Sequence, residues 1–226
     1  MFRHGCGVPL RHCSAPAPYP AQPLDYYTKS KIMGEKLVLA ANGTGKLATV
    51  ALRPSYVYGE YDRLFIPLII QKAREGKMKY HFGQGIMMPT YAGNAAQAHI
   101  QAAEALTLDS PLAGRPYFTT DSAPRPFWQF LGDVLQPLGY ERPHIPLPGL
   151  LMWVLAWIFQ YLIVPLLRPI VSLQATEFSP ERIRIMLCKR ILRIDNARRD
   201  FGYEPKISTD EGIRRTAHYF QHLRKA

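Results

Sequence analysis

Tyr27 and Lys31 lie four residues apart in the sequence and form an arrangement suited to proton transfer. On a helix, residues at this spacing lie on one face, so a phenol and an ammonium would serve the same small volume. A cation about 4 Å from a phenolate stabilises it by roughly 1 to 4 kcal/mol at intermediate dielectric. Tyr27 could then take a proton from a substrate alcohol, and Lys31 could also hydrogen-bond the ribose hydroxyls of a nucleotide cofactor.

This spacing alone is weak evidence for a catalytic site. A chain with 13 tyrosines produces such a match by chance with appreciable frequency. The alternative interpretation is an amphipathic helix with an exposed lysine. The neighbouring elements must therefore decide between the two.

The elements around this pair are typical of half of a doubly wound domain. A helix is predicted from Asp25 to the Asn42-Gly43 stop, followed by the small apolar run Leu47 to Leu52. Such a run predicts a strand covered on both sides, as in a parallel sheet. Helix followed by buried strand therefore favours a Rossmann-like α/β fold.

The segment after this strand is the expected cofactor loop, because ligands of open α/β sheets lie beyond the carboxyl ends of the strands. Pro54 fixes the turn and leaves the backbone of Val57 free to hydrogen-bond a carboxamide. The alternative is an ordinary loop with an exposed arginine, Arg53.

Charge and cysteine content exclude several functional classes. The net charge is +11, and about half of the excess lies after Ser179. Aromatic stacking motifs and zinc spacings are missing there, so a solvated face or an anionic membrane surface is favoured over nucleic acid. Cys6, Cys13 and Cys188 fit neither a metal site nor an even disulfide framework, which favours a reducing compartment.

The remaining chain alternates predicted helices and short strands. Asn94 is predicted to cap a helix over 95–106, and His99 on this helix is assigned to neighbouring side chains rather than to a metal. Further predictions are helices over 65–75, 126–138, 179–187, 196–200 and 209–223, and strands over 79–82, 117–120 and 191–194.

The stretch Leu150 to Leu167 contains no charged residue and is followed at once by Arg168. Its 18 residues are at the length threshold for crossing a bilayer, and Trp153, Trp157 and Tyr161 favour the interface. We expect a membrane-embedded or interfacial helix, with a buried helix lining an apolar pocket as the alternative.

Several of these pieces, taken in order, resemble the 3β-hydroxysteroid dehydrogenase/isomerase family of extended short-chain dehydrogenases. The resemblance covers about residues 24 to 224. It is carried by Tyr27-Thr-Lys-Ser-Lys31, Ala51-Leu-Arg-Pro54, Tyr58-Gly-Glu60, Tyr91-Ala-Gly-Asn94, Leu167-Arg-Pro169, Ala197 to Pro205 and Glu211-Gly-Ile213.

The resemblance implies oxidation of the 3β-hydroxyl of a steroid or sterol with NAD, with NADP as the alternative cofactor. Tyr27 would be the general base and Lys31 its electrostatic partner and ribose contact. Pro54 and Val57 would form the nicotinamide site. The stretch Leu150 to Leu167 resembles the membrane-associated helix of the family, which implies the endoplasmic reticulum membrane in a eukaryote and otherwise the cytoplasmic face of a membrane. A homodimer is left open.

One departure concerns the dinucleotide-binding half, a strand, glycine-rich turn and helix that precede the catalytic tyrosine in the family. Gly43-Thr-Gly45 has the wrong order of elements, and Ser14 is a poor substitute for the family's upstream Ser or Thr. We therefore expect the carboxyl-terminal part of a partial Rossmann-like parallel sheet. The expected division is an irregular Pro-rich segment over 1–24, Rossmann-like residues over 25–120, and a mostly helical substrate and membrane-associated region over 121–226.

Two other functions stay open at this point. The first is a non-catalytic, membrane-associated remnant or partner of a full-length relative, which the departure favours. The second is another extended short-chain enzyme acting on nucleotide sugars or flavonoids. That enzyme would explain Tyr27 and Lys31 equally well, but it would not explain the apolar stretch.

Overall fold

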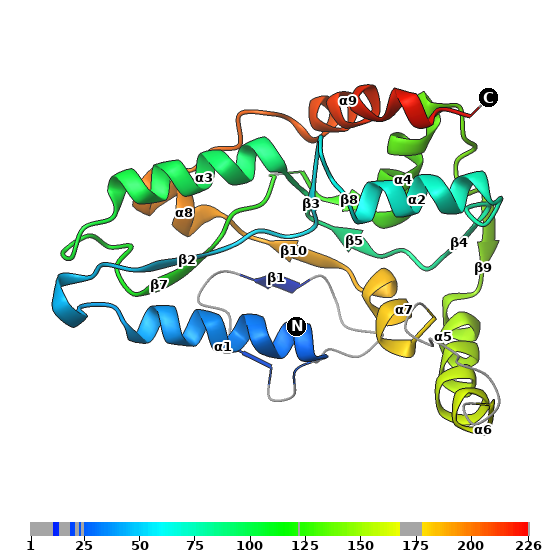
Figure 1. The fold of residues 1–226 in the computed structure, drawn as a ribbon, viewed down its shortest axis with the longest axis horizontal. Coiled ribbons are helices and arrows are strands. Elements are labelled where there is room, and N and C mark those ends of the chain that lie inside the picture. Colours follow the sequence, from blue (N-terminus) through cyan, green and yellow to red (C-terminus); the bar gives the residue numbers. More distant parts are fainter. Residues whose placement is uncertain are drawn as a thin grey trace.

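The computed structural model describes residues 11–13, 19–20, 23, 25–121, 123–167 and 178–225. Figure 1 shows strands β2 and β7 between helix α1 on one side and helices α3 and α8 on the other. The bounds of these elements are α1 Tyr26–Ala40, β2 Val50–Arg53, α3 Ala92–Ala105, β7 Arg115–Phe118 and α8 Asp195–Phe201.

Helix α1 has the ends that the sequence predicts. The Asp25 carboxylate accepts a hydrogen bond from the Thr28 N–H at 2.7 Å, which caps the first turn. The chain leaves the helix through Gly43, whose φ of 80° lies in the left-handed region where glycine has no steric penalty. The predicted helix from Asp25 to Asn42-Gly43 is thus confirmed.

The strand after α1 lies later than predicted and is less buried. It spans Val50–Arg53 and pairs in parallel with β7, with Val50 opposite Arg115. Helices α1 and α3 contact it from its two sides, as expected for a strand covered on both sides, but all its residues are only half-buried. The burial is incomplete because, among the described residues, only β7 pairs with the strand, and one flank borders a pocket beside α1.

Beyond β2 the chain forms short strand pairs that link distant segments. Strands β3 (Val57–Tyr58) and β6 (Thr90–Tyr91) are parallel, as are β4 (Tyr80–Phe82) and β9 (Ile145–Leu147). Strands β5 and β8 are antiparallel, and β1 and β10 are parallel; their bounds are β1 Arg11–Cys13, β5 Ile86–Met87, β8 Arg125–Pro126 and β10 Arg190–Leu192.

Strand β1 corrects part of the expectation for the amino-terminal segment. Irregular backbone was expected over 1–24, but Arg11–Cys13 pairs with β10. The prolines at 16, 18, 20 and 23 lie outside these three residues, so the backbone there is free to join a ladder. Residues 19, 20 and 23 have no regular secondary structure, as expected, whereas the rest of that segment, including Ser14 and Cys6, and Arg168-Pro169 fall outside the described residues.

The main core lies among helices α2 (Phe65–Arg74), α4 (Phe127–Leu135) and α9 (Thr209–Tyr219), all close to the predicted ranges. Helix α4 continues as a 3₁₀ turn that ends at Gly139, as predicted, with φ of 81°. The fully buried side chains of this core include Ile66 and Ile70 of α2, Phe130, Val134 and Leu135 of α4, and Leu138 of the 3₁₀ turn.

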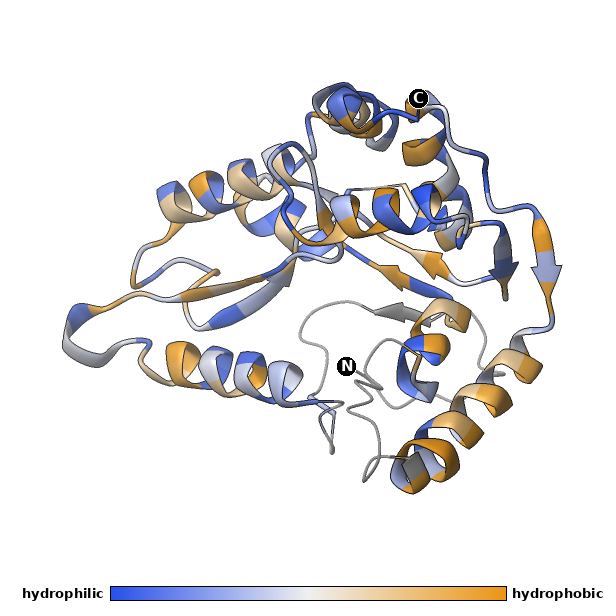
Figure 2. Ribbon diagram, turned by 45° about the vertical axis from the view of Figure 1, so that its right-hand side comes forward, coloured by the Kyte–Doolittle hydropathy of each residue, from blue (hydrophilic) through white to orange (hydrophobic). Residues whose placement is uncertain are grey.

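The apolar stretch forms helix α5 (Gly149–Ile158), a π-helical segment over 159–163 and helix α6 (Val164–Leu167). Figure 2 shows these elements projecting at one corner and coloured as hydrophobic. The window Gly149–Leu166 is long and apolar enough to cross a membrane, and only 6% of it is buried. One side packs on α7 (Pro180–Leu187) around Ala156 and Ile183. The alternative of a buried helix is therefore wrong for the described residues.

Candidate functional site

Tyr27 and Lys31 line the same pocket, as their spacing predicts. The pocket measures about 650 Å³ and lies between α1 and β2. The Tyr27 side chain is 70% exposed, and the Lys31 Nζ lies 5.4 Å from the centroid of its ring. An ammonium over a phenol ring at this distance is a cation–π contact, worth about 0.5–1 kcal/mol at an exposed site. The two groups therefore share one volume that is open to a ligand.

Of the predicted nicotinamide contacts, Pro54 lines this pocket and Val57 does not. Val57 lies in β3 with its side chain 46% exposed. The Thr90 N–H donates to the carbonyl of Tyr56 at 3.3 Å, and in a parallel ladder this pattern turns the backbone groups of Val57 away from β6. The Val57 amide thus points away from its paired strand, as a ligand contact would require.

Two residues that form the floor of the pocket were not assigned a role from the sequence. Arg53 Nη2 lies 2.6 Å from Glu35 Oε1 and Arg53 Nε lies 2.9 Å from Glu35 Oε2, and each side chain is 16% exposed. Tyr19 donates to the same carboxylate at 2.7 Å. The alternative interpretation of Arg53 as an exposed arginine is therefore wrong.

Electrostatics make this ion pair a firm link between α1 and β2. Burial by itself raises the pKa of the Glu35 carboxyl, but hydrogen bonds from Arg53 and Tyr19 outweigh it and leave the pKa below its usual range. A sequence signal existed, because Glu35 follows Lys31 by one helical turn and must share its face. The sequence did not predict the ion pair itself, because no pattern near Glu35 identified Arg53 as its partner.

His99 of α3 also lines the pocket, with its Nδ1 2.7 Å from the carbonyl of Ala95. The described residues contain no group of three His, Cys, Asp or Glu side chains that could hold a metal ion. His99 is exposed, so its ring can hydrogen-bond a ligand in the pocket.

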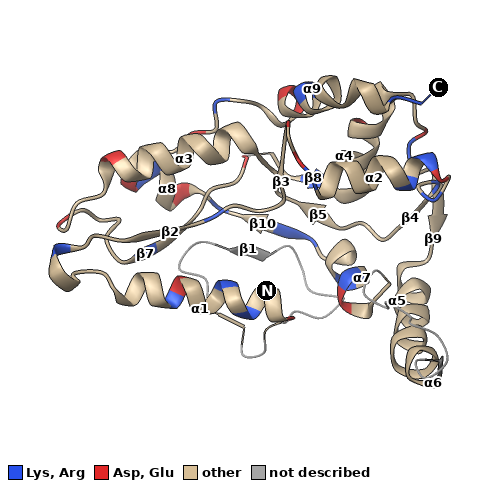
Figure 3. Ribbon diagram, in the orientation of Figure 1, with Lys and Arg blue, Asp and Glu red and all other residues tan. Residues whose placement is uncertain are grey.

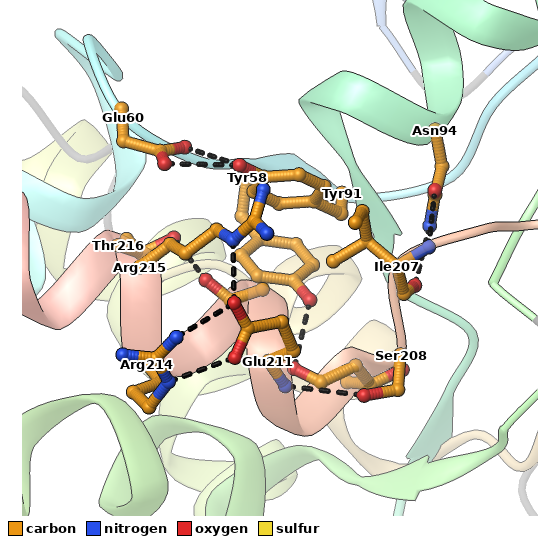
Figure 4. A network of polar contacts seen from close by, with 12 residues as sticks. Tyr58, Glu60, Tyr91, Asn94, Ile207, Ser208, Glu211, Arg214, Arg215 and Thr216 are labelled. Atoms are coloured by element: carbon orange, nitrogen blue, oxygen red, sulfur yellow. Dashed lines mark hydrogen bonds and ion pairs between the residues drawn. The ribbon is translucent and has the colours of Figure 1, made fainter.

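A second polar cluster, the Asn94 network, lies in the interior. The Asn94 amide donates to Asp121 Oδ1 and to the carbonyl of Ile207, both at 2.7 Å, and its oxygen accepts from the Ile207 N–H at 3.0 Å. Figure 4 shows Asn94 facing Ile207, beside Tyr58 and Tyr91. The prediction that Asn94 caps α3 is wrong, because its side chain forms its hydrogen bonds with Asp121 and Ile207 and not with the first turn of α3.

The Asn94 network extends to β3, β6 and α9. Tyr58 donates to the carbonyl of Thr209 at 3.1 Å, and the Tyr91 N–H donates to Asp121 Oδ2 at 3.1 Å. Burial raises the pKa of Asp121 to about 6, although the hydrogen bonds from Asn94 and Tyr91 oppose it. Near the surface, Glu60 accepts from the Tyr91 hydroxyl at 2.7 Å. These groups hold α3 and α9 to the strands.

Comparison with known proteins gives a consistent match. Residues 5–149 match the 3-beta hydroxysteroid dehydrogenase/isomerase family. A mouse protein named "Sterol-4-alpha-carboxylate 3-dehydrogenase, decarboxylating" is 36% identical over 222 residues, which cover 97% of this chain and 61% of the mouse protein. The "3beta-hydroxysteroid-dehydrogenase/decarboxylase isoform 1" of Arabidopsis thaliana is 37% identical over 213 residues, covering 92% of this chain and 48% of the plant protein.

Solved structures show the same fold at lower identity. The crystal structure of gox2253 has a TM-score of 0.71 and 18% identity, covering 98% of this chain and 63% of that one. The dTDP-glucose 4,6-dehydratase of Bacillus anthracis str. Ames, solved in complex with NAD, has a TM-score of 0.60 and 18% identity, covering 96% and 57%. These likenesses confirm the predicted Rossmann-like α/β fold. The chain spans less than two thirds of the length of each of these four proteins.

Proposed function

Because the chain belongs to the 3-beta hydroxysteroid dehydrogenase/isomerase family, we propose that it oxidises the 3-hydroxyl of a sterol or steroid with a nicotinamide dinucleotide. The observation that carries the proposal is the shared pocket of Tyr27 and Lys31, walled by Pro54. A proton acceptor, a cation and the carboxyl end of a parallel strand meet there, which is the position for a dinucleotide in such folds.

In this proposal Lys31 stabilises the phenolate form of Tyr27. The phenolate accepts the hydroxyl proton of the substrate, which leaves Tyr27 as a neutral phenol. The pocket fits the nicotinamide end of a cofactor, since Pro54 lines it together with Tyr27, and the backbone of Val57, three residues further along the chain, points away from β6. Bound NAD or NADP would supply the hydride acceptor. Glu35 and Arg53 fix the distance between α1 and β2, so the base stays aligned with the ligand.

The substrate proposed in finer detail is a sterol that carries a carboxylate beside its 3-hydroxyl. The support comes from the names of the mouse and Arabidopsis relatives, which describe a sterol-4-alpha-carboxylate and a decarboxylase. Oxidation of a 3-hydroxy acid gives a 3-keto acid. The keto acid releases CO₂ because its carbonyl takes up the electron pair of the broken carbon–carbon bond.

Membrane association is a second part of the proposal. The exposed apolar side chains of α5 and α6 include Leu150 at 71%, Leu162 at 57% and Leu166 at 76%. Such a surface suits a bilayer interface, where a sterol substrate is dissolved. We expect the full chain to float with vesicles, and carbonate extraction to separate an integral helix from an interfacial one. Leu162→Asp with Leu166→Asp should abolish flotation, whereas Leu64→Asp, at a side chain 81% exposed elsewhere, should not.

The decisive experiment for the dehydrogenase is cofactor binding followed by turnover. Isothermal titration of the detergent-solubilised chain should detect NAD or NADP binding below millimolar concentration. Tyr27→Phe should leave that binding unchanged and lower turnover by about 10² to 10⁴-fold, the usual contribution of a general base.

Tyr26→Phe is the matched control, since Tyr26 is 88% exposed, adjoins Tyr27 and does not line the pocket. Retained turnover in Tyr27→Phe would reject the base assignment. Lack of affinity for either dinucleotide would reject the dehydrogenase and favour the non-catalytic, membrane-associated partner.

A further inference from the structure

Arg190 in β10 is a half-buried guanidinium with an unusual set of partners. Its Nη2 donates to the Tyr56 hydroxyl at 2.6 Å, and its Cζ lies 5.6 Å from the centroid of the Tyr56 ring. No carboxylate of the described residues forms an ion pair with it. By contrast, its neighbours Arg193, Arg198 and Arg199 each pair with an acid.

A guanidinium with unfilled hydrogen-bond donors is suited to bind an anion. It carries five N–H donors in a planar fork, and the described protein atoms take one of these donors. A carboxylate fits the fork through two parallel hydrogen bonds. The Tyr56 ring fixes the guanidinium plane, so less side-chain freedom would be lost on binding. Figure 3 shows that β10 carries basic residues.

The conformation of Tyr56 supports a functional role for this contact. Its φ is 46°, in the left-handed region that costs a non-glycine residue about 1–3 kcal/mol. Two contacts hold the strained backbone in place: Thr90 N–H donates to the Tyr56 carbonyl at 3.3 Å, and Ser55 N–H donates to Thr90 Oγ1 at 3.1 Å. Strain of this kind persists where the surrounding structure enforces it, and it is common at ligand sites.

The location connects Arg190 to the proposed substrate site. Tyr56 follows Pro54 by two residues, and Pro54 shares a pocket with Tyr27. Tyr56 also precedes Val57, whose backbone points away from β6. The loop 54–57 thus leads from Pro54, in the pocket of Tyr27, to Tyr56, which Arg190 contacts.

We propose that Arg190, held by Tyr56, binds the carboxylate of the substrate and so selects a 3-hydroxy acid. This inference rests on the function proposed above and adds the specificity-determining residue. The substrate hydroxyl faces Tyr27, and the adjacent carboxylate enters the fork of Arg190. Lys31 is engaged with the Tyr27 ring, so the guanidinium supplies the paired counter-charge that a carboxylate needs in a partly dehydrated site.

Equilibrium binding of two matched ligands to the full chain in detergent tests the proposal. The ligands are a 3β-hydroxysterol 4-carboxylate and its methyl ester, which differ in the negative charge. Wild-type chain should bind the acid more tightly than the ester. Arg190→Gln should weaken acid binding about 10- to 100-fold, as expected when a hydrogen bond to a charged group is lost, and should leave ester binding unchanged.

Three further variants separate recognition from structure. Arg190→Lys keeps the charge but loses the fork, so acid binding should fall by less than in Arg190→Gln. Tyr56→Phe removes the hydroxyl that accepts from Nη2 and should weaken acid binding about 3- to 10-fold. Arg193→Gln is the matched control on the same segment, because Arg193 already pairs with Asp195, and it should change neither affinity.

Each outcome decides the matter. Equal affinity of wild-type chain for acid and ester, or an equal loss of both in Arg190→Gln, would overturn the role of Arg190 while leaving the dehydrogenase proposal intact. Failure of wild-type chain to bind either sterol would instead reject the proposed substrate class. A loss confined to the acid would establish the carboxylate contact.

Discussion

The pocket beside α1 and the Asn94 network use similar side chains under opposite conditions. In the pocket, Tyr27 is 70% exposed and has a cation over its ring. In the network, Tyr58 is 1% exposed and its hydroxyl donates to a backbone carbonyl. Burial raises the pKa of Tyr58 far above the usual range, with the charge of Asp121 acting in the same direction. A tyrosine in the network is thereby fixed as a neutral donor.

The difference shows which polar groups stabilise the fold and which are available to a ligand. In the network, Asn94 and Asp121 find partners inside the protein, so removing any one of them leaves the others unpaired in the interior. In the pocket, the groups that face the open volume keep unfilled hydrogen-bonding capacity. We therefore expect network variants to change the free energy of unfolding and pocket variants to change ligand chemistry.

The largest expected effect is that of Asn94→Ala. The Asn94 side chain is fully buried, and its loss would leave Asp121 and both backbone groups of Ile207 without these bonds. We expect the free energy of unfolding to fall by about 3–5 kcal/mol, the range for breaking a buried network that contains a charge. Urea unfolding followed by circular dichroism measures the change.

Gln97→Ala is the control for that variant. Gln97 lies on the same helix and donates one surface hydrogen bond to the carbonyl of Glu204 at 3.2 Å. Its loss should cost less than about 1 kcal/mol. If the two variants were equally stable, the network would not be the structural centre that its burial indicates.

Asp121 should make the free energy of unfolding depend on pH, with a change of about 3 kcal/mol that is smaller than the effect of Asn94→Ala. Burial raises the pKa of Asp121 from 3.8 to about 6 in the folded chain. The folded state therefore binds more protons than the unfolded state between about pH 4 and 6. This contribution to stability is complete below pH 4 and is lost as the pH rises through 6.

The measurement is the difference in unfolding free energy between wild-type chain and Asp121→Asn from pH 4 to 7. Subtraction removes the opposite slopes of acids with lowered pKa, such as Glu35 and Asp200. The wild-type chain should lose stability relative to the variant as the pH rises. A pH-independent difference would mean that Asp121 titrates normally and that its burial is incomplete in solution.

Local sequence rules predicted the elements that depend on neighbouring residues. The start of α1 at about Asp25, Gly43 and Gly139 as helix ends, and Tyr27 with Lys31 on one face all follow from spacing within a turn or two. The buried strand was placed three residues early, because the small apolar run begins at Leu47 while pairing with β7 begins at Val50.

Contacts between distant segments could not be predicted from the same rules. Asn94 bonds Ile207, which is 113 positions away, and Arg190 bonds Tyr56, which is 134 positions away. Asparagine is a common cap residue, so its position before a helical pattern predicted a cap. In the structure its hydrogen bonds to distant residues take the place of that local contact. The role of Arg53 was missed for the same reason, since its partner Glu35 lies across a loop on another element.

Glu35→Gln should have the next smaller effect, because it removes the charge opposite Arg53 but keeps the shape of the side chain. We expect a loss of about 1–3 kcal/mol in unfolding free energy, the range for a hydrogen bond to a charged group. Glu104→Gln on the exposed face of α3 is the control and should change stability by less than about 0.5 kcal/mol. Equal effects would show that the ion pair does not join α1 to β2.

Lys31→Met should have the smallest effect on stability and provides the sharpest test of the pocket. The contact that it removes is a cation over an exposed ring, so the free energy of unfolding should change by no more than about 0.5–1 kcal/mol. Turnover should fall about tenfold or more, because the phenolate of Tyr27 loses its counter-charge. Lys29→Met changes net charge equally on the same helix but lies outside the pocket, so it should alter neither quantity. Matching losses of turnover in both variants would mean that overall charge, rather than the position of Lys31 beside Tyr27, supports the chemistry.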